Sequence, residues 1–144
     1  MSVQKSLEEQ EERFRLLTEK SFTGFVLIQN GDIVYINPRY CEIIGYEKDE
    51  LTKAEDLFKI THKDDIGEVK QSIEDRKKGL IDHVHYQCRM HHKNGDIVYC
   101  DVYGSIVTIN GKEAIMASIM DITESVINRT ELESSVKEKK YSAC

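Results

Sequence analysis

Three Asn-Gly pairs constrain the fold of this 144-residue chain more than any other feature. They lie at residues 30–31, 94–95 and 110–111, each between two short runs rich in β-branched and aromatic residues. A two-residue type I′ turn requires positive φ at both central positions, a conformation that Asn and Gly adopt with little strain. Each pair therefore predicts a β-hairpin, and the flanking runs predict its strands.

About fifty residues with helical patterns separate the first hairpin from the second. Asn37-Pro38 is typical of a helix start, because Asn is a good N-cap and Pro lacks an amide hydrogen that the first turn does not need. Gly45 is a suitable terminator for this helix.

A longer helix is expected at about residues 63–78. One face is apolar and the opposite face is charged. The apolar positions are Ile66, Val69 and Ile73. The sequence Arg-Lys-Lys at residues 76–78 provides cations at the C-terminus, ahead of Gly79. The element order is thus β-β, several helices, then β-β-β, which predicts an α+β fold.

Both ends of the chain have helical patterns. Residues 1–20 carry a seam at intervals of four and three, formed by the apolar Val3, Leu7, Phe14 and Leu17 with Gln10 between Leu7 and Phe14. Such a short seam is compatible with a helix packed on its own domain and with a dimerising coiled coil. Asp121 and Glu124 fit a capping box at the start of a second terminal helix. We expect a helix at 1–20, one domain at 21–122 and a linker helix at 123–144, in a chain cut from a longer protein.

Composition excludes several classes of function. Twenty Lys and Arg against 26 Asp and Glu argue against a general binder of nucleic acid or anionic membranes. No apolar run approaches the roughly 20 residues of a membrane helix. Four cysteines without a CxxC pair indicate free thiols in a reducing compartment, so we expect a cytoplasmic location. No phosphate-binding loop, HExxH or GxSxG motif is present, and we expect no catalysis within this segment.

Several motifs together resemble a PAS sensor domain over about residues 12–125. They are "INPRYCEIIGY" at 36–46, "KNGDIVY" at 93–99, and the closing Asp121-Ile122-Thr123. The resemblance implies a PAS fold: a five-stranded antiparallel sheet in the order 2-1-5-4-3, with helices on one face and signalling helices at both ends. It makes Asp121-Ile122-Thr123 the hinge between the last strand and the output helix.

The resemblance also implies a function within a larger signalling protein. We expect a sensory module, with a sensor histidine kinase of a two-component system as the preferred parent and a cyclic-di-GMP synthase or phosphodiesterase as another. The expected partners are the adjacent output domain and a second copy, through the N-terminal helix and the outer sheet face. The alternative is a ligand-free scaffold that dimerises or docks other proteins.

The family's ligand pocket lies between the sheet and the helices. Alternation of side chains along the strands, aligned with the family, gives candidate lining residues. They are Val26, Ile28, Tyr40, Ile44, Ile66, Val69, Ile73, Tyr86, Cys88, Met90, Cys100, Val102, Ile106, Ile115 and Ile119. Such a lining suits a small apolar ligand, and it also suits a core closed by its own side chains, which we favour.

The resemblance disfavours both common cofactors. Light-oxygen-voltage members use a reactive cysteine where this chain has Asp56, and amide side chains where it has Met90, Cys100 and Ile119. Haem-binding members usually take a proximal histidine from the long helix, and residues 64–78 contain none, although His62 lies just ahead. No cofactor is therefore expected.

The stretch "DHVHYQCRMHH" at residues 82–92 concentrates possible metal ligands. Strand alternation assigns its side chains to two opposite faces. The histidines of the outer face are His83, His85 and His91, whereas Cys88 and Met90 face the pocket. These groups cannot converge on one ion, and a single closed metal site is not expected.

Overall fold

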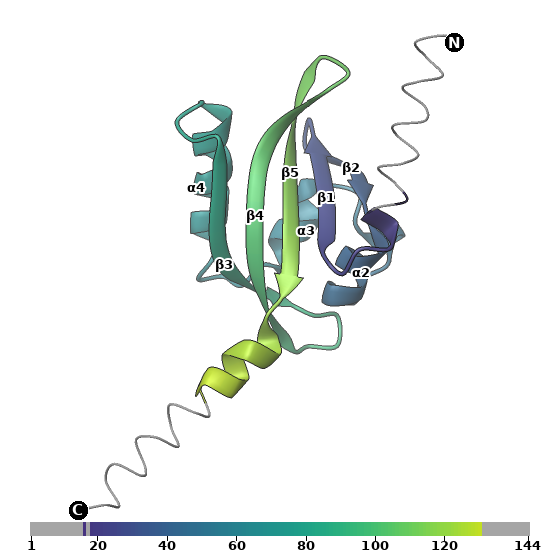
Figure 1. The fold of residues 1–144 in the computed structure, drawn as a ribbon, viewed down its shortest axis with the longest axis vertical. Helices are drawn as coiled ribbons and strands as arrows, with labels where there is room; N and C mark the ends of the chain where they lie inside the picture. The colour runs from purple at the N-terminus through teal and green to yellow at the C-terminus, as the bar shows by residue number, and fades with distance from the viewer. Residues whose placement is uncertain (1–15, 17, 131–144) are drawn as a thin grey trace, which may run out of the picture.

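The computed structural model describes residue 16 and residues 18–130. Five strands form one antiparallel sheet in the order β2-β1-β5-β4-β3, and the helices lie behind one face of it (Figure 1). The elements are β1 (Gly24–Gln29), β2 (Asp32–Ile36), α2 (Pro38–Ile44), the 3-10 helix η1 (Lys48–Glu50), α3 (Ala54–Ile60), α4 (Ile66–Lys77), β3 (His83–His91), β4 (Ile97–Ile109) and β5 (Lys112–Asp121). The predicted fold class and strand order are confirmed.

Two of the three Asn-Gly pairs form the predicted turns. Asn30 and Asn110 have φ of 54° and 52°, and the glycines that follow them have φ of 78° and 76°. Positive φ at both positions gives the twist that joins β1 to β2 and β4 to β5.

The third pair lies in a wider loop, so the prediction of a two-residue turn there is wrong. β3 ends at His91 and β4 begins at Ile97. His92 Nδ1 accepts the Asn94 amide at 3.1 Å, and Asn94 Oδ1 accepts the Asp96 amide at 2.9 Å. These two side chains thus accept backbone amides within the loop and stabilise a connection longer than a two-residue turn.

The helices start and stop close to the predicted positions. Asn37 caps α2, and Gly45 ends it with φ of 77° and its amide donating to the Cys41 carbonyl at 2.8 Å. α4 begins at Ile66, later than expected, because Asp65 is held against β3. Among the described residues no helix is long and apolar enough to cross a bilayer.

Asp65 joins the start of α4 to the edge strand β3. Its carboxylate accepts hydrogen bonds from the Arg89 amide at 2.7 Å, from Nε at 3.0 Å and from Nη2 at 2.8 Å. These bonds from Arg89 lower the pKa of the Asp65 carboxyl, with burial opposing the shift. The ion pair fixes the connection between α3 and α4 along the sheet edge.

Each outer edge of the sheet is bridged by a segment from the helical layer. Thr61, just after α3, forms an antiparallel bridge with Met90 of β3. Lys53, just before α3, forms one with Asp32 of β2. The α3 region therefore clasps the sheet at both sides.

The core lies between the sheet and the helices. Its most deeply buried apolar side chains come from α2 and from three strands: Ile44, Val26, Cys100 and Ile119. The predicted alternation is visible along β3, where Cys88 and Met90 are buried and Gln87 and His91 are exposed. The inward-facing register read from the sequence is thus reproduced.

Asn37 is fully buried and satisfies four backbone groups. Its Oδ1 accepts the amides of Phe25 at 2.8 Å and Tyr40 at 3.0 Å. Its Nδ2 donates to the carbonyls of Thr18 at 2.7 Å and Thr23 at 3.0 Å. One side chain thereby joins the segment before the domain, strand β1 and helix α2.

We predict that Asn37→Ala lowers the free energy of unfolding by about 3 kcal/mol, since buried backbone donors and acceptors lose their partner. Urea unfolding measures this loss. The control Asn94→Ala removes an exposed amide and should change stability by less than about 1 kcal/mol. Equal effects of the two substitutions would contradict the role given to Asn37.

We also predict a pH dependence from Asp65. Its pKa is lower in the folded state, so its contribution to stability is complete above the ordinary carboxyl pKa of about 4 and is lost as the pH falls through the folded-state pKa. The stability gap between wild type and Asp65→Asn should be constant from about pH 7 to about pH 5 and close below about pH 4. The neighbouring exposed Asp64→Asn should show no such gap in the same denaturation series.

Candidate functional site

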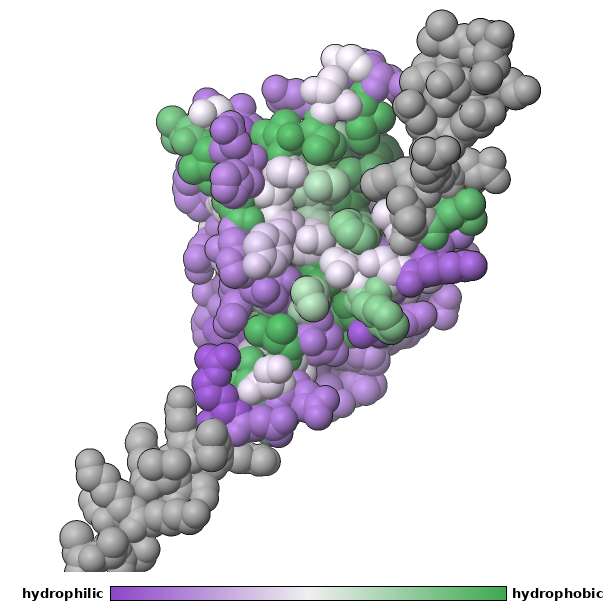
Figure 2. All heavy atoms as spheres, viewed as in Figure 1, coloured by the Kyte–Doolittle hydropathy of each residue, from purple (hydrophilic) through white to green (hydrophobic). Residues whose placement is uncertain are grey.

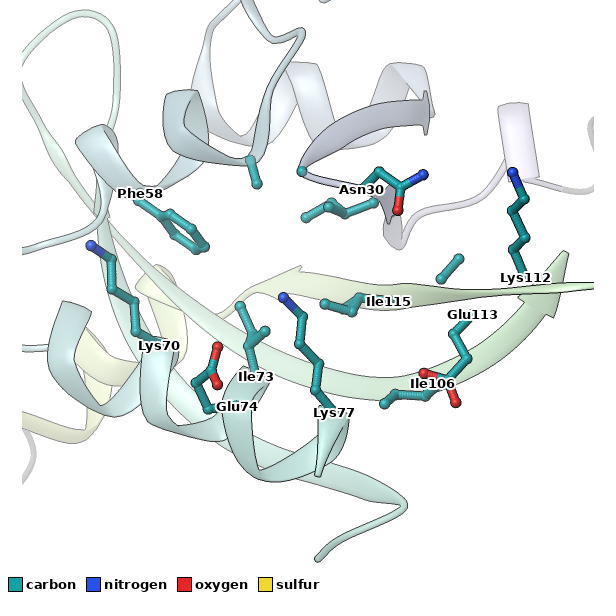
Figure 3. Close-up of a pocket in the computed structure, with 14 residues that line it drawn as sticks. Asn30, Phe58, Lys70, Ile73, Glu74, Lys77, Ile106, Lys112, Glu113 and Ile115 are labelled. Atoms are coloured by element: carbon teal, nitrogen blue, oxygen red, sulfur yellow. The ribbon is translucent and has the colours of Figure 1, made fainter. Parts of the chain in front are cut away.

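A half-open cavity of about 850 Å³ lies between α3, α4 and the end of the sheet where the Asn30 and Asn110 turns are (Figure 3). Ile106 and Ile115 form its wall on the sheet side, and Phe58 and Ile73 point into it from the two helices (Figure 3). The interior is therefore largely apolar.

Charged side chains surround the mouth of this cavity. Lys70 and Lys77 extend from α4, and Lys112 and Glu113 stand at the start of β5 (Figure 3). The Lys70 ammonium lies over the Phe58 ring, 5.3 Å from its centroid, in a cation–π contact. With Glu74, the rim carries three cations and two carboxylates, which favours an anionic group over a cationic one at the entrance.

The structure separates the predicted pocket residues into two groups. Those that line the cavity are Ile28, Ile73, Ile106 and Ile115. The others lie outside the lining, most of them in the packed core: Val26, Tyr40, Ile44, Val69, Cys88, Met90, Cys100, Val102 and Ile119, with Ile66 and Tyr86 partly buried. The inner face thus has a closed part and an open part.

The closed part contains two thiols that meet across the sheet. Cys88 of β3 is the direct partner of Cys100 of β4, and both are free. Burial raises the pKa of Cys88 to about 12, and it raises the pKa of Cys100 as well. Protonated thiols are poor nucleophiles, so at neutral pH these residues pack as small apolar side chains.

The residues present do not fit a photoactive flavin. The carboxylate of Asp56 accepts the amides of Thr52 and Lys53, both at 3.0 Å, and thereby caps α3. These backbone hydrogen bonds lower the pKa of Asp56. Met90, Cys100 and Ile119 lie in the closed core and offer no amide to a flavin ring.

The histidines are engaged in separate local contacts. His62 stacks on His91 with ring centroids 5.6 Å apart, and its Nδ1 accepts the Asp64 amide at 3.1 Å. His85 lies 2.6 Å from Asp101 and stacks on Tyr103. Within the described residues no group of three or more His, Cys, Asp and Glu side chains is arranged to hold a metal ion.

The segment Asp121–Thr123 is tied to β4 where β5 ends. The Ile122 amide donates to the Tyr99 carbonyl at 2.8 Å, and the Tyr99 amide donates to Thr123 Oγ1 at 3.0 Å. Asp121 Oδ1 accepts the Thr123 amide at 2.9 Å, and the next helical bond runs from Val126 to Ile122. The first helical bond thus starts at Ile122, one residue later than predicted, because Asp121 still belongs to β5, while its carboxylate accepts an amide at the start of the helix as a capping side chain does.

The outer face of the sheet carries exposed apolar side chains. Tyr103 of β4 and Met120 of β5 are 50% and 48% exposed. Figure 2 looks onto this face and shows hydrophobic side chains over the central strands. Of the residues predicted to form the dimer helix, Val3, Leu7, Phe14 and Leu17 all lie outside the described residues.

Arg76 is the residue that sequence reasoning missed. The sequence identifies it only as one of three cations at the C-terminus of α4, whereas the structure buries it to 3% exposure. The signal was present: Arg76 follows Val69 by seven residues and Ile73 by three, which is the spacing of the buried helix face.

Comparisons with known proteins agree with this architecture. The family model described as "PAS fold" matches residues 33–120. "Probable diguanylate cyclase DgcE" of Escherichia coli (strain K12) is 29% identical over 130 residues, which are 88% of this chain and 12% of that protein. The chain therefore spans about one eighth of this relative.

Two solved structures illustrate the likeness in fold. The PAS domain of an HTR-like protein from Haloarcula marismortui gives a TM-score of 0.67 at 20% identity, covering 83% of this chain and 97% of that one. A domain of a sensory box sensor histidine kinase/response regulator from Geobacter sulfurreducens gives 0.64 at 21% identity, covering 80% and 96%. Strand order, helical layer and family match lead to one conclusion: the chain belongs to the PAS fold family.

Proposed function

We propose that this chain is the sensory module of a larger signalling protein and that its half-open cavity takes a small ligand with an apolar body. The cavity is the observation that carries the proposal. Ile73 and Phe58 reach into it from two helices, and Ile106 and Ile115 back it from the sheet. A largely apolar space with a few polar groups at its mouth is the usual form of a small-molecule site.

β5 is the element that connects this cavity to the output end. Ile115 lines the cavity near the start of the strand, and Asp121 ends the strand at the hinge. The bonds of Ile122 and Thr123 to Tyr99 hold the hinge to β4. A ligand that repacks Ile115 would shift β5 against β4 and alter the direction of the helix at residues 123–130.

For the output we propose a sensor histidine kinase in the cytoplasm, with a diguanylate cyclase as the other candidate. The Geobacter sulfurreducens neighbour supports the first choice and the relative from Escherichia coli supports the second. The gene product that contains this chain decides between them.

We predict that Ile73→Trp places a bulky ring in the apolar part of the cavity, between α4 and the sheet, and abolishes ligand binding there. In a thermal-shift screen of apolar small molecules, a ligand at a hundredfold excess over its Kd should stabilise wild type by about 2.7 kcal/mol and leave Ile73→Trp unchanged. Leu80→Trp, at a side chain 70% exposed, is the matched control and should behave as wild type. The hydrogen-exchange rate of the Tyr99 amide should change when the ligand is added to wild type or Leu80→Trp, and should stay the same in Ile73→Trp.

A panel without any stabilising compound, together with unchanged exchange at Tyr99, would overturn the sensing role. The ligand-free interaction module would then remain as the function of the domain.

The exposed apolar side chains of the outer face favour a second role, dimerisation. Tyr103 stacks on His85 with centroids 4.0 Å apart, and His85 bonds to Asp101, so this part of the surface is held in a fixed shape. Fixed aromatic side chains are well suited to association because little side-chain entropy is lost on contact. A second copy of this chain, with its N-terminal helix, is the proposed partner.

We predict that Tyr103→Glu converts the dimer to a monomer, since a carboxylate would be desolvated in the contact. Sedimentation velocity should show half the mass of wild type. Leu80→Glu, which adds the same charge at an exposed position before β3, should leave the dimer intact. A wild-type monomer at all concentrations would refute this role.

A further inference from the structure

Arg76 is a buried cation without a counter-ion. Its side chain is 3% exposed, and its one hydrogen bond runs from Nε to the Ser72 carbonyl of its own helix at 3.4 Å. Nη1 has no hydrogen-bond partner, and no carboxylate of the described residues pairs with the guanidinium. Such an arrangement is unfavourable, because a buried charge needs a partner to offset its desolvation.

The sheet is shaped to admit this guanidinium. Gly104 of β4 lies beneath it, and a Cβ atom at this position would overlap Nη1 of Arg76 and approach a methyl group of Val84. The glycine therefore leaves a notch in the inner face of the sheet. The charged group extends from α4 into this notch and does not turn toward solvent.

A second polar group at the same place is also unsatisfied. Ser72 Oγ, one helical turn before Arg76, is buried and has no hydrogen-bond partner. Tyr86 lies close enough for its electrostatic interaction with Arg76 to be felt, but burial raises the pKa of Tyr86 to about 12. The phenol is thus protonated at neutral pH and cannot neutralise the guanidinium. Two buried polar groups one helical turn apart, the guanidinium of Arg76 and the hydroxyl of Ser72, thus lack a partner, and no anion of the described residues is paired with either.

This polar pair adjoins the ligand cavity. Ile73 and Lys77, which flank Arg76 along α4, both line the cavity. On β4, Ile106 lines it as well and is the next inward-facing residue after Gly104. Arg76 and Gly104 do not line the cavity themselves, but each is a near neighbour along its own element of a residue that does.

We infer that the ligand is a small organic carboxylate with an apolar chain or ring, whose carboxylate binds Nη1 of Arg76 and the hydroxyl of Ser72. The inference rests on the proposed sensing role of the cavity. One guanidinium balances one negative charge, which fits a monoanion and leaves a phosphate dianion undercompensated. The apolar body occupies the space among Ile73, Ile106 and Ile115, and the lysines of the rim attract the anion to the entrance.

The test is isothermal titration calorimetry of the full chain with two acids and two neutral counterparts: octanoate, benzoate, 1-octanol and benzyl alcohol. In wild type at least one acid should bind tenfold or more tightly than its alcohol. Arg76→Met should remove this preference and keep the affinity for the alcohol. Ser72→Ala should reduce the preference for the acid severalfold. This second variant tests the inference even if Arg76→Met does not fold. Lys78→Met removes an exposed cation at the C-cap of the same helix and should leave both affinities unchanged.

The stability of the ligand-free protein provides an independent readout. Arg76→Met should unfold at the same or a higher urea concentration than Lys78→Met, because it removes an uncompensated buried charge. A lower midpoint would reveal a structural partner for Arg76 and overturn the inference. Equal affinity of acids and alcohols in wild type would overturn the carboxylate but leave ligand sensing in place. Absence of binding by all four compounds would overturn the carboxylate inference, whereas the sensing role is decided by the wider panel and the Tyr99 exchange described above.

Discussion

Four hydrogen bonds of a single amide side chain hold the N-terminal half of the domain together. Asn37 joins the carbonyls of Thr18 and Thr23 to the amides of Phe25 and Tyr40, in a place without access to water. Since each of these groups would otherwise be buried without a partner, the position of α2 relative to β1 depends on this residue. The placement of α2 in turn closes the core around Ile44.

The inner face of the sheet borders two different environments, a closed core and an open cavity. Around Cys88 and Cys100 the packing is closed, and burial keeps both thiols protonated. Toward the Asn-Gly turns the helices leave an open cavity, with the unpaired guanidinium of Arg76 beside it. The closed core keeps the domain folded, and the cavity beside it has room for a ligand. Local packing around the cavity can therefore change without unfolding the domain.

Local chemistry explains why much of this was predictable from the sequence. Asn30-Gly31 and Asn37-Pro38 specify their own backbone conformation, and alternation along β3 separates the histidines from Cys88. The burial of a side chain is harder to predict, because it depends on how distant elements of the chain pack against it. Arg76 is buried since Gly104, on a distant strand, leaves room for it, and the cavity exists since α3 and α4 stand apart. The local sequence around Arg76, or around the cavity residues, therefore predicts neither the burial nor the cavity.

The bridges at the two sheet edges limit what this domain can build. Thr61 and Lys53 engage Met90 and Asp32, so a strand from another molecule would have to displace them to extend the sheet in register. The helices cover one face, and the outer face is the remaining broad surface (Figure 1). Each bridge engages one residue of its edge strand, so it restricts strand addition at that end of the edge. In the dimer proposed above, each copy covers the outer face of the other, so the assembly is a closed pair with no further copy needed to complete it.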